Sequence, residues 1–407
     1  MSPYLKNLFP PAIGFVVLYF ATVYGSPLWL NYRDLLMILP IGFFAVVALI
    51  ALYLLQYAYV YTAALLGSVY LVIQWHLQIT LLDPVVYLIF IWVNLLFPIL
   101  LLIVVILASR RLLSLGGGAI IVLIVALFVL PFWFGQLHAA DIISQLPDLL
   151  FVPSWSSSLP FGLWLSYVPV GIFLVLIYFL NPTRLQAFWL SALIGQGIVF
   201  LNFSIPFISS LVSTLLGLLL VVGLMQTAYE LAFIDELTAI PGRKALEKRL
   251  LNLGRRYCIA MLDVDHFKKF NDTYGHDVGD QVLRMVAAQV ENVTGGGKAF
   301  RYGGEEFTIL FPGKNMAQAH LHAERVRIAI ADYKLQLRAI SRPSDNKTGK
   351  QNRQGNTRQS VSVTISIGLA QRTSQANEPA DVMKLADKAL YAAKKSGRNC
   401  VRGFKAG

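Results

Sequence analysis

The chain has 407 residues, 56% of them hydrophobic, and a mean hydropathy of +0.61. Soluble proteins are closer to half apolar, so this composition excludes an ordinary soluble protein. Residues 1–230 contain five basic and five acidic residues, so the whole net charge of +12 lies in the remainder. We therefore expect two domains, an apolar membrane domain followed by a basic soluble domain.

The first part of the chain contains long apolar runs, and a helix needs about 20 mostly apolar residues to cross a bilayer. Such runs lie near 12–30, 35–55, 58–77, 84–108, 117–136, 161–180, 186–204 and 207–227. We expect eight spans, although a count of seven is also compatible with the sequence. Because further spans follow the first run, we expect no cleavable signal peptide.

The basic residues favour eight spans with an inside amino terminus. Arg110, Arg111 and Arg184 then lie in inside loops, and the loop near 137–160, which lacks Lys and Arg, lies outside. Polar residues within the spans are few, and we expect Gln74, Asn94, Gln196 and Asn202 to form hydrogen bonds between helices. The scarcity of ionisable residues in the spans disfavours a transport protein.

The last span leads directly into the soluble part. No glycine or proline interrupts residues 224–238, so we expect the helix to continue. The predicted domains are a membrane sensory domain (1–227), a helical linker (228–238) and a soluble domain (239–407). A stiff linker can transmit a shift between domains, and a passive tether fits the sequence equally well.

The soluble part alternates strand-like and helix-like patterns. We expect strands at 257–262, on either side of a turn at 303–304, and at 361–369, with helices at 280–293, 316–337 and 379–395. This βαββαβ order predicts an α+β domain with a mixed sheet covered by helices. The segment 341–360 has no large apolar side chain and is expected to be a mobile loop. Cys258 and Cys400 fit no metal-ligand spacing and indicate a reducing compartment.

Two groups of carboxylates follow predicted strands. Asp263 and Asp265 come directly after the first strand, and Glu305 and Glu306 lie in the segment 301–307, Arg-Tyr-Gly-Gly-Glu-Glu-Phe. Adjacent glycines between apolar runs predict a tight hairpin. Mg²⁺ takes a few oxygen ligands from protein and completes its shell with phosphate oxygens and water. We therefore predict that carboxylates from two neighbouring strands hold a divalent cation against a nucleoside triphosphate.

Several ordered motifs between about 233 and 403 resemble those of the GGDEF family of diguanylate cyclases, here with the Gly-Gly-Glu-Glu-Phe variant. The likeness rests on Asp235-x-Leu237-Thr238, Asp263-x-Asp265-x-Phe267-Lys268, Asn271-x4-His276-x3-Asp280, the segment 301–307, Ser366-Ile367-Gly368 and Lys394-x3-Arg398-Asn399. The resemblance implies condensation of two GTP molecules to cyclic di-GMP with release of pyrophosphate. It also implies a bacterial inner-membrane protein with its catalytic domain in the cytoplasm, controlled by the membrane domain.

The resemblance also implies roles for single residues. Asp263, the Val264 carbonyl and Glu305 would hold Mg²⁺ or Mn²⁺, and Glu305, with Glu306 as second candidate, would help deprotonate the attacking 3′-hydroxyl. The expected substrate-binding residues are Gly303 and Gly304 at the turn, Asn271 and Asp280 at guanine, His276 near the substrate, and Lys268, Lys394 and Arg398 at the phosphates. Purely structural roles stay open for three of these residues, with Asp280 as a helix N-cap and with Lys394 and Arg398 at a helix end.

The expected partners are GTP, the lipid bilayer and a second copy of the chain, because one domain binds one GTP and the reaction joins two. No nucleic acid partner is expected. The alternative function is an inactive receptor for GTP or cyclic di-GMP that signals through protein contacts.

Two positions depart from the family pattern. Gly242-Arg243 stands where the family often has Asn-Arg, which puts that local contact in doubt. Thr-Gly-Gly-Gly at 294–297 replaces the Arg-x-x-Asp of the usual inhibitory product site, so we expect weak or absent feedback inhibition by this route.

Overall fold

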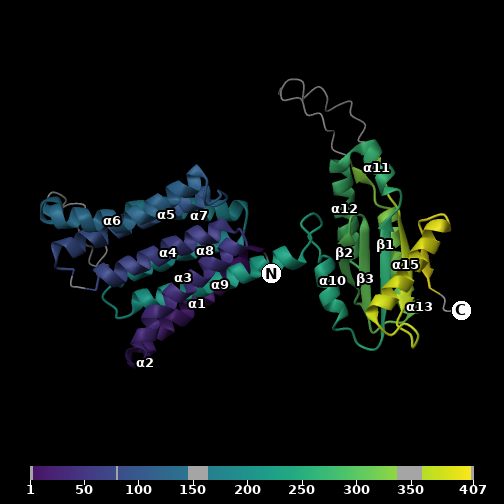
Figure 1. Ribbon diagram of the computed structural model, residues 1–407, viewed down its shortest axis with the longest axis horizontal. Helices are drawn as coiled ribbons and strands as arrows, with labels where there is room; N and C mark the ends of the chain where they lie inside the picture. Colours follow the sequence, from purple (N-terminus) through teal and green to yellow (C-terminus); the bar gives the residue numbers. More distant parts are fainter. Residues whose placement is uncertain (1–2, 79–80, 145–163, 337–359, 405–407) are drawn as a thin grey trace, which may run out of the picture. The chain divides into compact units, whose positions relative to one another are not determined.

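The computed structural model describes residues 3–78, 81–144, 164–336 and 360–404 (Figure 1). The chain divides into two compact units, Met1–Ala228 and Tyr229–Gly407, which are described separately below. The predicted mobile loop 341–360 lies outside the described residues apart from Ser360.

All described secondary structure in the first unit is helical. Its helices are α1 (Pro3–Tyr24), α2 (Ser26–Asn31), α3 (Arg33–Tyr53), α4 (Tyr57–His76), α5 (Pro84–Leu107), α6 (Leu115–Ser144), α7 (Trp164–Leu180), α8 (Arg184–Leu201) and α9 (Ile208–Phe233), whose residues 229–233 belong to the second unit. Among the described residues six of these, α1, α3, α4, α5, α8 and α9, are long and apolar enough to cross a bilayer. The apolar stretches found in α6 and α7, Leu115–Leu127 and Leu165–Leu180, are shorter. The structure thus supports several apolar helices without confirming eight spans.

Three predicted boundaries in this unit differ from the structure. The first apolar run was placed at 12–30, but α1 ends at Tyr24, because Gly25 precedes the separate helix α2, which has proline in its first turn. Residues 137–144 belong to α6 and not to an outer loop, whereas 145–163 lie outside the described residues. Helix α9 ends at Phe233, five residues before the predicted end of the linker.

Only some of the polar side chains inside the first unit form the predicted hydrogen bonds between helices. Gln74 on α4 donates to Ser209 Oγ and Ser210 Oγ on α9, both at 3.4 Å, which confirms an interhelical role. Asn94 and Asn202 instead donate to carbonyls four residues earlier in the chain, because an amide side chain in a helix easily reaches that position.

The second unit contains a five-stranded mixed sheet in the order β2-β3-β1-β6-β7, in which only β6 and β7 are parallel. Its strands are β1 (Tyr257–Val264), β2 (Lys298–Gly303), β3 (Glu306–Pro312), β6 (Ile365–Gln371) and β7 (Val401–Gly403), and β4 (Leu335–Gln336) pairs separately with β5 (Ser360–Val361). Its helices are α10 (Arg243–Leu250), α11 (Phe267–Tyr274), α12 (His276–Glu291), α13 (Met316–Ala331) and α15 (Pro379–Lys395). The mixed sheet was predicted; the β4–β5 pair, β7 and the division of α11 from α12 extend the order beyond βαββαβ.

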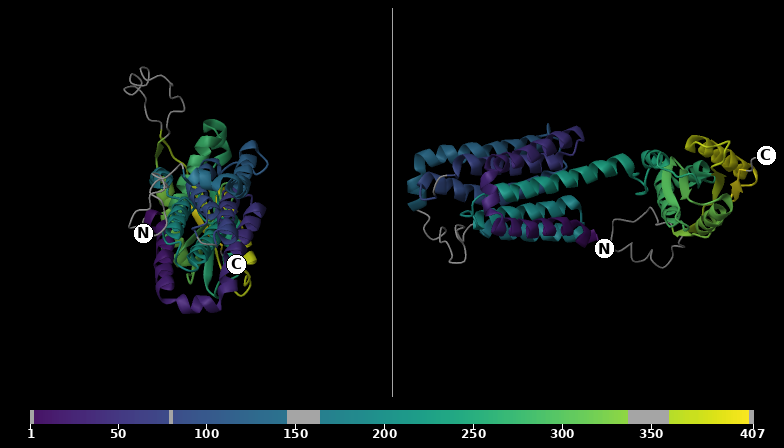
Figure 2. Two further views of the ribbon diagram at one scale, coloured as in Figure 1. Left: turned by 90° about the vertical axis from the view of Figure 1, so that its left-hand side faces the viewer. Right: turned by 90° about the horizontal axis from the view of Figure 1, so that it is seen from below.

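Helices cover both faces of this sheet (Figures 1 and 2). Alternate residues of β1 point to opposite faces, as the pleat of a strand requires. Cys258, Ala260 and Leu262 pack with α12 and α13 in one core cluster. Tyr257 and Met261 belong to a second cluster with α10 and α15. Asp263 continues this second series, so its carboxylate lies on the face covered by α15.

Candidate active site

The hairpin between β2 and β3 turns at two glycines. Gly304 has φ of +54°, a left-handed conformation that glycine adopts without strain, and the register shifts between Arg301 and Gly303. A Cβ atom built on Gly303 or Gly304 would meet no atom within 4 Å. Space for a ligand therefore lies directly beside the backbone of the turn.

Arg301 fixes the turn to the segment that follows α9. Its guanidinium donates to the Gly304 carbonyl from Nε (3.2 Å) and Nη2 (2.8 Å), and from Nη1 to Asp235 Oδ1 (2.7 Å). Asp235 Oδ1 also accepts from the backbone N and the hydroxyl of Thr238. Burial raises the pKa of Asp235, but the bonds from Thr238 and Arg301 outweigh it and hold the pKa below its ordinary 3.8. In the sequence, Arg301 and Asp235 were recognised only as parts of family motifs. Their contact spans 66 positions and therefore leaves no local pattern.

The carboxylates predicted to work together lie on the neighbouring strands β1 and β3 and, for Glu305, in the turn directly before β3. In the β1–β3 register Asp263 is opposite Glu306, and Val264 N donates to the Glu305 carbonyl at 3.3 Å. Asp263 is only 7% exposed. Burial raises the pKa of Glu305 and of Glu306, and the nearby charge of Asp263 raises both further. The structure therefore brings these three acidic side chains to one edge of the sheet.

Two positively charged side chains, Lys394 and Arg398, lie close enough to Asp263 to affect its pKa. Lys394 Nζ, near the end of α15, lies 2.8 Å from Asp263 Oδ2. Burial raises the pKa of Asp263, and the opposing effects of Lys394 and Arg398 compensate for only part of this rise. The positive charges predicted at the phosphates thus lie beside the acidic group even without a nucleotide.

Asp265 has a different role from the one expected of it. Its carboxylate accepts hydrogen bonds from Thr364 Oγ1 (2.7 Å), Ser366 Oγ (2.6 Å) and the backbone N of Asn399 (3.0 Å). The prediction of a cation platform shared by Asp263 and Asp265 is therefore wrong for Asp265. It anchors the segment after α15 and so positions Arg398, whose φ is +65°.

The residues expected at guanine lie on α11 and α12. Asn271 Oδ1 is buried and accepts no hydrogen bond from any described residue. Asp280 is the fifth residue of α12 and half-buried, so its interpretation as a helix N-cap is wrong; Gly275, with φ of +85°, holds that position. His276 is the first residue of α12, and Lys268 is the second of α11; both are exposed.

The donor set limits how a metal ion can be held. Among the described residues, no group of three or more His, Cys, Asp or Glu side chains is arranged to hold a metal ion. Two carboxylates and one carbonyl suit Mg²⁺ or Mn²⁺ only if phosphate oxygens and water supply the other ligands. The residues fit a cation that arrives with a nucleotide.

The second unit thus combines a mixed sheet with an acidic hairpin that turns at two glycines. Residues 232–400 match the family model described as "Diguanylate cyclase, GGDEF domain". This part of the chain therefore belongs to the GGDEF family, which confirms the resemblance drawn from the motifs.

Several known proteins are similar to this part of the chain. The chain is 35% identical over 187 residues to the response regulator PleD of Caulobacter vibrioides, covering 44% of this chain and 37% of PleD. It is also 35% identical over 175 residues to the diguanylate cyclase VdcA of Vibrio cholerae, covering 42% and 46%. The GGDEF domain of DgcB from Caulobacter crescentus, solved with c-di-GMP, is 34% identical, with coverage of 43% of this chain and 94% of that one and a TM-score of 0.37. The chain spans less than half the length of these two curated relatives.

Proposed function

We propose that the chain is a membrane-bound diguanylate cyclase that condenses two GTP molecules into cyclic di-GMP and releases pyrophosphate. The observation that carries this proposal is the position of Asp263 beside Glu305 and Glu306 at the edge of a GGDEF sheet. Lys394 adds a positive charge and the glycine turn adds open space at the same edge. Phosphoryl transfer needs chiefly positioning and charge neutralisation, and this arrangement supplies both.

The proposed cation site consists of Asp263, the Val264 carbonyl and Glu305, with Mg²⁺ or Mn²⁺ as the ion. When bound, such an ion polarises the α-phosphate and neutralises charge on the leaving pyrophosphate. Lys394, Arg398 and Lys268 bind phosphate oxygens in this proposal. In this proposal Lys394 leaves Asp263 for the phosphates when the nucleotide binds, because the Asp263 carboxylate would then be a ligand of the metal ion.

Proton transfer from the ribose 3′-hydroxyl is assigned to Glu305. A general base works best when its pKa lies near the working pH. Burial and the charge of Asp263 move the pKa of Glu305 upward from the ordinary 4.5, which is in that direction. Glu306 is exposed to the same influences and stays the second candidate.

Guanine recognition is assigned to Asn271 and Asp280. The buried Asn271 Oδ1 lacks a donor among the described residues, and buried polar atoms almost always have a partner. An N–H group of guanine would supply one. The Asp280 carboxylate would accept from N1–H and N2–H₂, which adenine does not offer, so the site would reject ATP. His276, at the start of the same helix, is assigned a position near the nucleotide in this proposal.

The other parts of the proposal concern assembly and control. Two copies are required, each giving a 3′-hydroxyl to the other's α-phosphate. The domain 1–227 lies in the bacterial inner membrane and controls the cytoplasmic domain 239–407 through the linker 228–238. The turn 294–297 offers two glycines with positive φ and a Thr294 hydroxyl engaged with His322, so we propose weak product inhibition by this route.

Product analysis of the full chain in lipid nanodiscs with GTP and Mg²⁺ tests the proposal. We expect cyclic di-GMP and pyrophosphate in a ratio of one to two, and loss of both in Glu305→Gln. The matched control is Glu291→Gln at the exposed end of α12. Binding of GTP without any product would favour the inactive receptor and refute the cyclase.

A further inference from the structure

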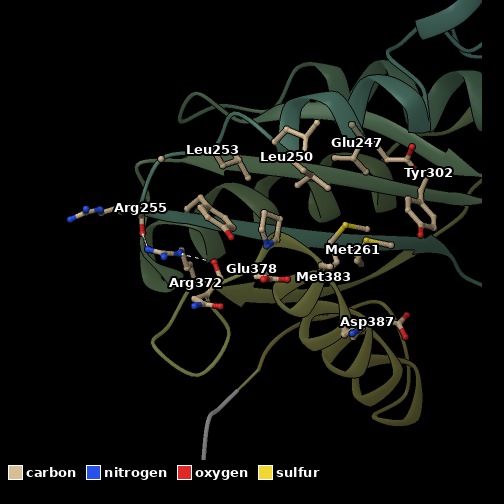
Figure 3. Close-up of a pocket in the computed structure, with 18 of the residues that line it drawn as sticks. Glu247, Leu250, Leu253, Arg255, Met261, Tyr302, Arg372, Glu378, Met383 and Asp387 are labelled. Atoms are coloured by element: carbon tan, nitrogen blue, oxygen red, sulfur yellow. Dashed lines mark hydrogen bonds between the residues drawn. The ribbon is translucent and has the colours of Figure 1, made fainter.

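The sheet face that carries Asp263 also has a groove of about 990 Å³ between α10 and α15 (Figure 3). Pockets for small ligands commonly have volumes of about 300–1,000 Å³. Neither Asn271 nor Asp280 lines this groove, so it is separate from the proposed guanine site.

The middle of the groove is apolar and adaptable. Leu250 and Leu253 line it from α10 and the residues after it, and Met261 and Met383 line it from β1 and α15 (Figure 3). Methionine side chains adjust readily to the shape of a ligand because they are unbranched and polarizable. This region suits a flat or compact hydrocarbon body.

A buried hydroxyl in the groove has no hydrogen-bond partner among the residues that the structure describes. Tyr257 is 2% exposed and lines the groove, and its hydroxyl makes no hydrogen bond within the described part of the chain. Since buried polar atoms are nearly always paired, this hydroxyl indicates a ligand with a hydrogen-bonding group.

A positive charge lies beside that hydroxyl. Arg372 follows β6, and its backbone N donates to the Tyr257 carbonyl at 3.1 Å, so the two residues are neighbours. The charge of Arg372 acts against the burial that raises the pKa of Tyr257. The guanidinium donates to the carbonyls of Asn377 and Arg255, both at 3.0 Å. Glu378 lines the same end, but no carboxylate of the described residues forms an ion pair with Arg372.

The opposite end of the groove carries three carboxylates, of which Glu247 is paired with Arg243 at 2.9 Å. Glu247, Glu306 and Asp387 line it near the hairpin, and Figure 3 shows Glu247, Tyr302 and Asp387 at the end away from Arg372. An anionic group would be repelled there and attracted to Arg372. The two ends therefore fix the orientation of an acidic ligand.

We propose that this groove binds an amphipathic organic acid with a compact apolar body. Its carboxylate lies between the Tyr257 hydroxyl and Arg372, and its apolar body lies on Leu250, Met261 and Met383. Because Tyr302 also lines the groove, the ligand approaches the strand that leads into the acidic hairpin. The proposal does not depend on cyclase activity.

The test is hydrogen–deuterium exchange of the full chain in nanodiscs, titrated with 2-naphthoate. We expect slower exchange in α10, β1 and the first turns of α15. Tyr257→Phe should raise the half-saturating concentration of 2-naphthoate about tenfold, because a hydrogen bond to its charged carboxylate is lost. Tyr333→Phe, an exposed tyrosine outside the groove, is the matched control and should bind as the unmodified chain does. Met383→Trp should fill the groove and abolish protection.

The exchange pattern measured without 2-naphthoate shows whether each variant keeps its fold. If a variant does not fold, Arg372→Gln is tested in its place. Absence of naphthoate protection at saturation overturns the proposal, as does equal protection by uncharged 2-naphthalenemethanol. Protection that rises with protein concentration alone assigns the groove to a second copy and likewise overturns it. Protection by oleate without protection by naphthoate assigns it to lipid, with the same consequence. Product formation from GTP is measured separately, so failure here leaves the cyclase proposal intact.

Discussion

Replacing Gly368 by alanine tests how closely α15 must approach the sheet. Gly368 lies in β6, and a Cβ built there would collide with the backbone N of Leu390 and the carbonyl O of Ala386. It would also lie 2.6 Å from Leu390 Cα, where ordinary contact begins at 3.4 Å. Backbone atoms cannot rotate away, so α15 must move outward by about 0.8 Å or more.

This movement reaches the candidate active site. Lys394 follows Leu390 by about one helical turn, and its Nζ–Asp263 Oδ2 distance of 2.8 Å would lengthen to about 3.6 Å, beyond hydrogen-bond range. Overpacking of this kind costs about 1–3 kcal/mol of stability. A Lys394 side chain displaced in the same way would lose its proposed hydrogen bond to a phosphate oxygen of the bound nucleotide, about 1.5–3 kcal/mol, and this would lower cyclase activity about 10- to 100-fold.

The assay combines amide exchange of β6 and α15 with the rate of product formation, both in nanodiscs. A single melting temperature is not suitable, because a chain with two units need not unfold in one step. Gly254→Ala is the control, since a Cβ there would meet no atom within 4 Å. Unchanged exchange and unchanged activity in Gly368→Ala would refute the reasoning.

Four further outcomes are expected. Asp235→Asn should destabilise the hairpin by about 1–3 kcal/mol, measured by its amide exchange, because Asp235 accepts three hydrogen bonds through Oδ1. Burial raises the pKa of Glu305 above 4.5, so its ionisation costs stability as pH rises through the raised value. Glu305→Gln should therefore slow hairpin exchange relative to the unmodified chain at neutral pH, and this gain should vanish below about pH 4.5; a constant gain would contradict it. Burial raises the pKa of Cys258 to about 12, so iodoacetamide at pH 8 should label Cys400 and spare Cys258, as peptide mass mapping would show. Added cyclic di-GMP should leave the initial rate nearly unchanged, and strong inhibition that disappears on substituting 294–297 would show otherwise.

The parts of the fold that were predictable carry local signals. Helix α15 has the predicted bounds, because proline opens it and Gly397, with φ of +100°, follows it. The hairpin followed from two glycines between apolar runs. Strand β7 was missed because three residues show no periodicity and pair only after α15 returns the chain to β6.

The candidate site was predictable where a motif names the residue and not where a distant contact decides its role. Asp263 and Glu306 lie in register on adjacent strands, as the convergence of carboxylates required. Asp265 is also a carboxylate and follows two residues later. Its oxygens, however, accept hydrogen bonds from donors about 100 and 134 positions away in the chain. Arg301 likewise depends on Asp235, whose position follows from the course of the whole chain.

The alternation of side chains along β1 explains why the register matters for the site. Both faces of β1 are apolar up to Leu262, so its hydrophobic pattern alone does not distinguish one register from the next. A slip of one residue would turn Asp263 toward the face covered by α12 and α13, away from Lys394. Leaving a buried carboxylate without its partner costs about 3–5 kcal/mol. The Asp263–Lys394 pair therefore selects the register in which Asp263 meets the acidic hairpin, so the contact that positions the proposed catalytic carboxylate also specifies the sheet.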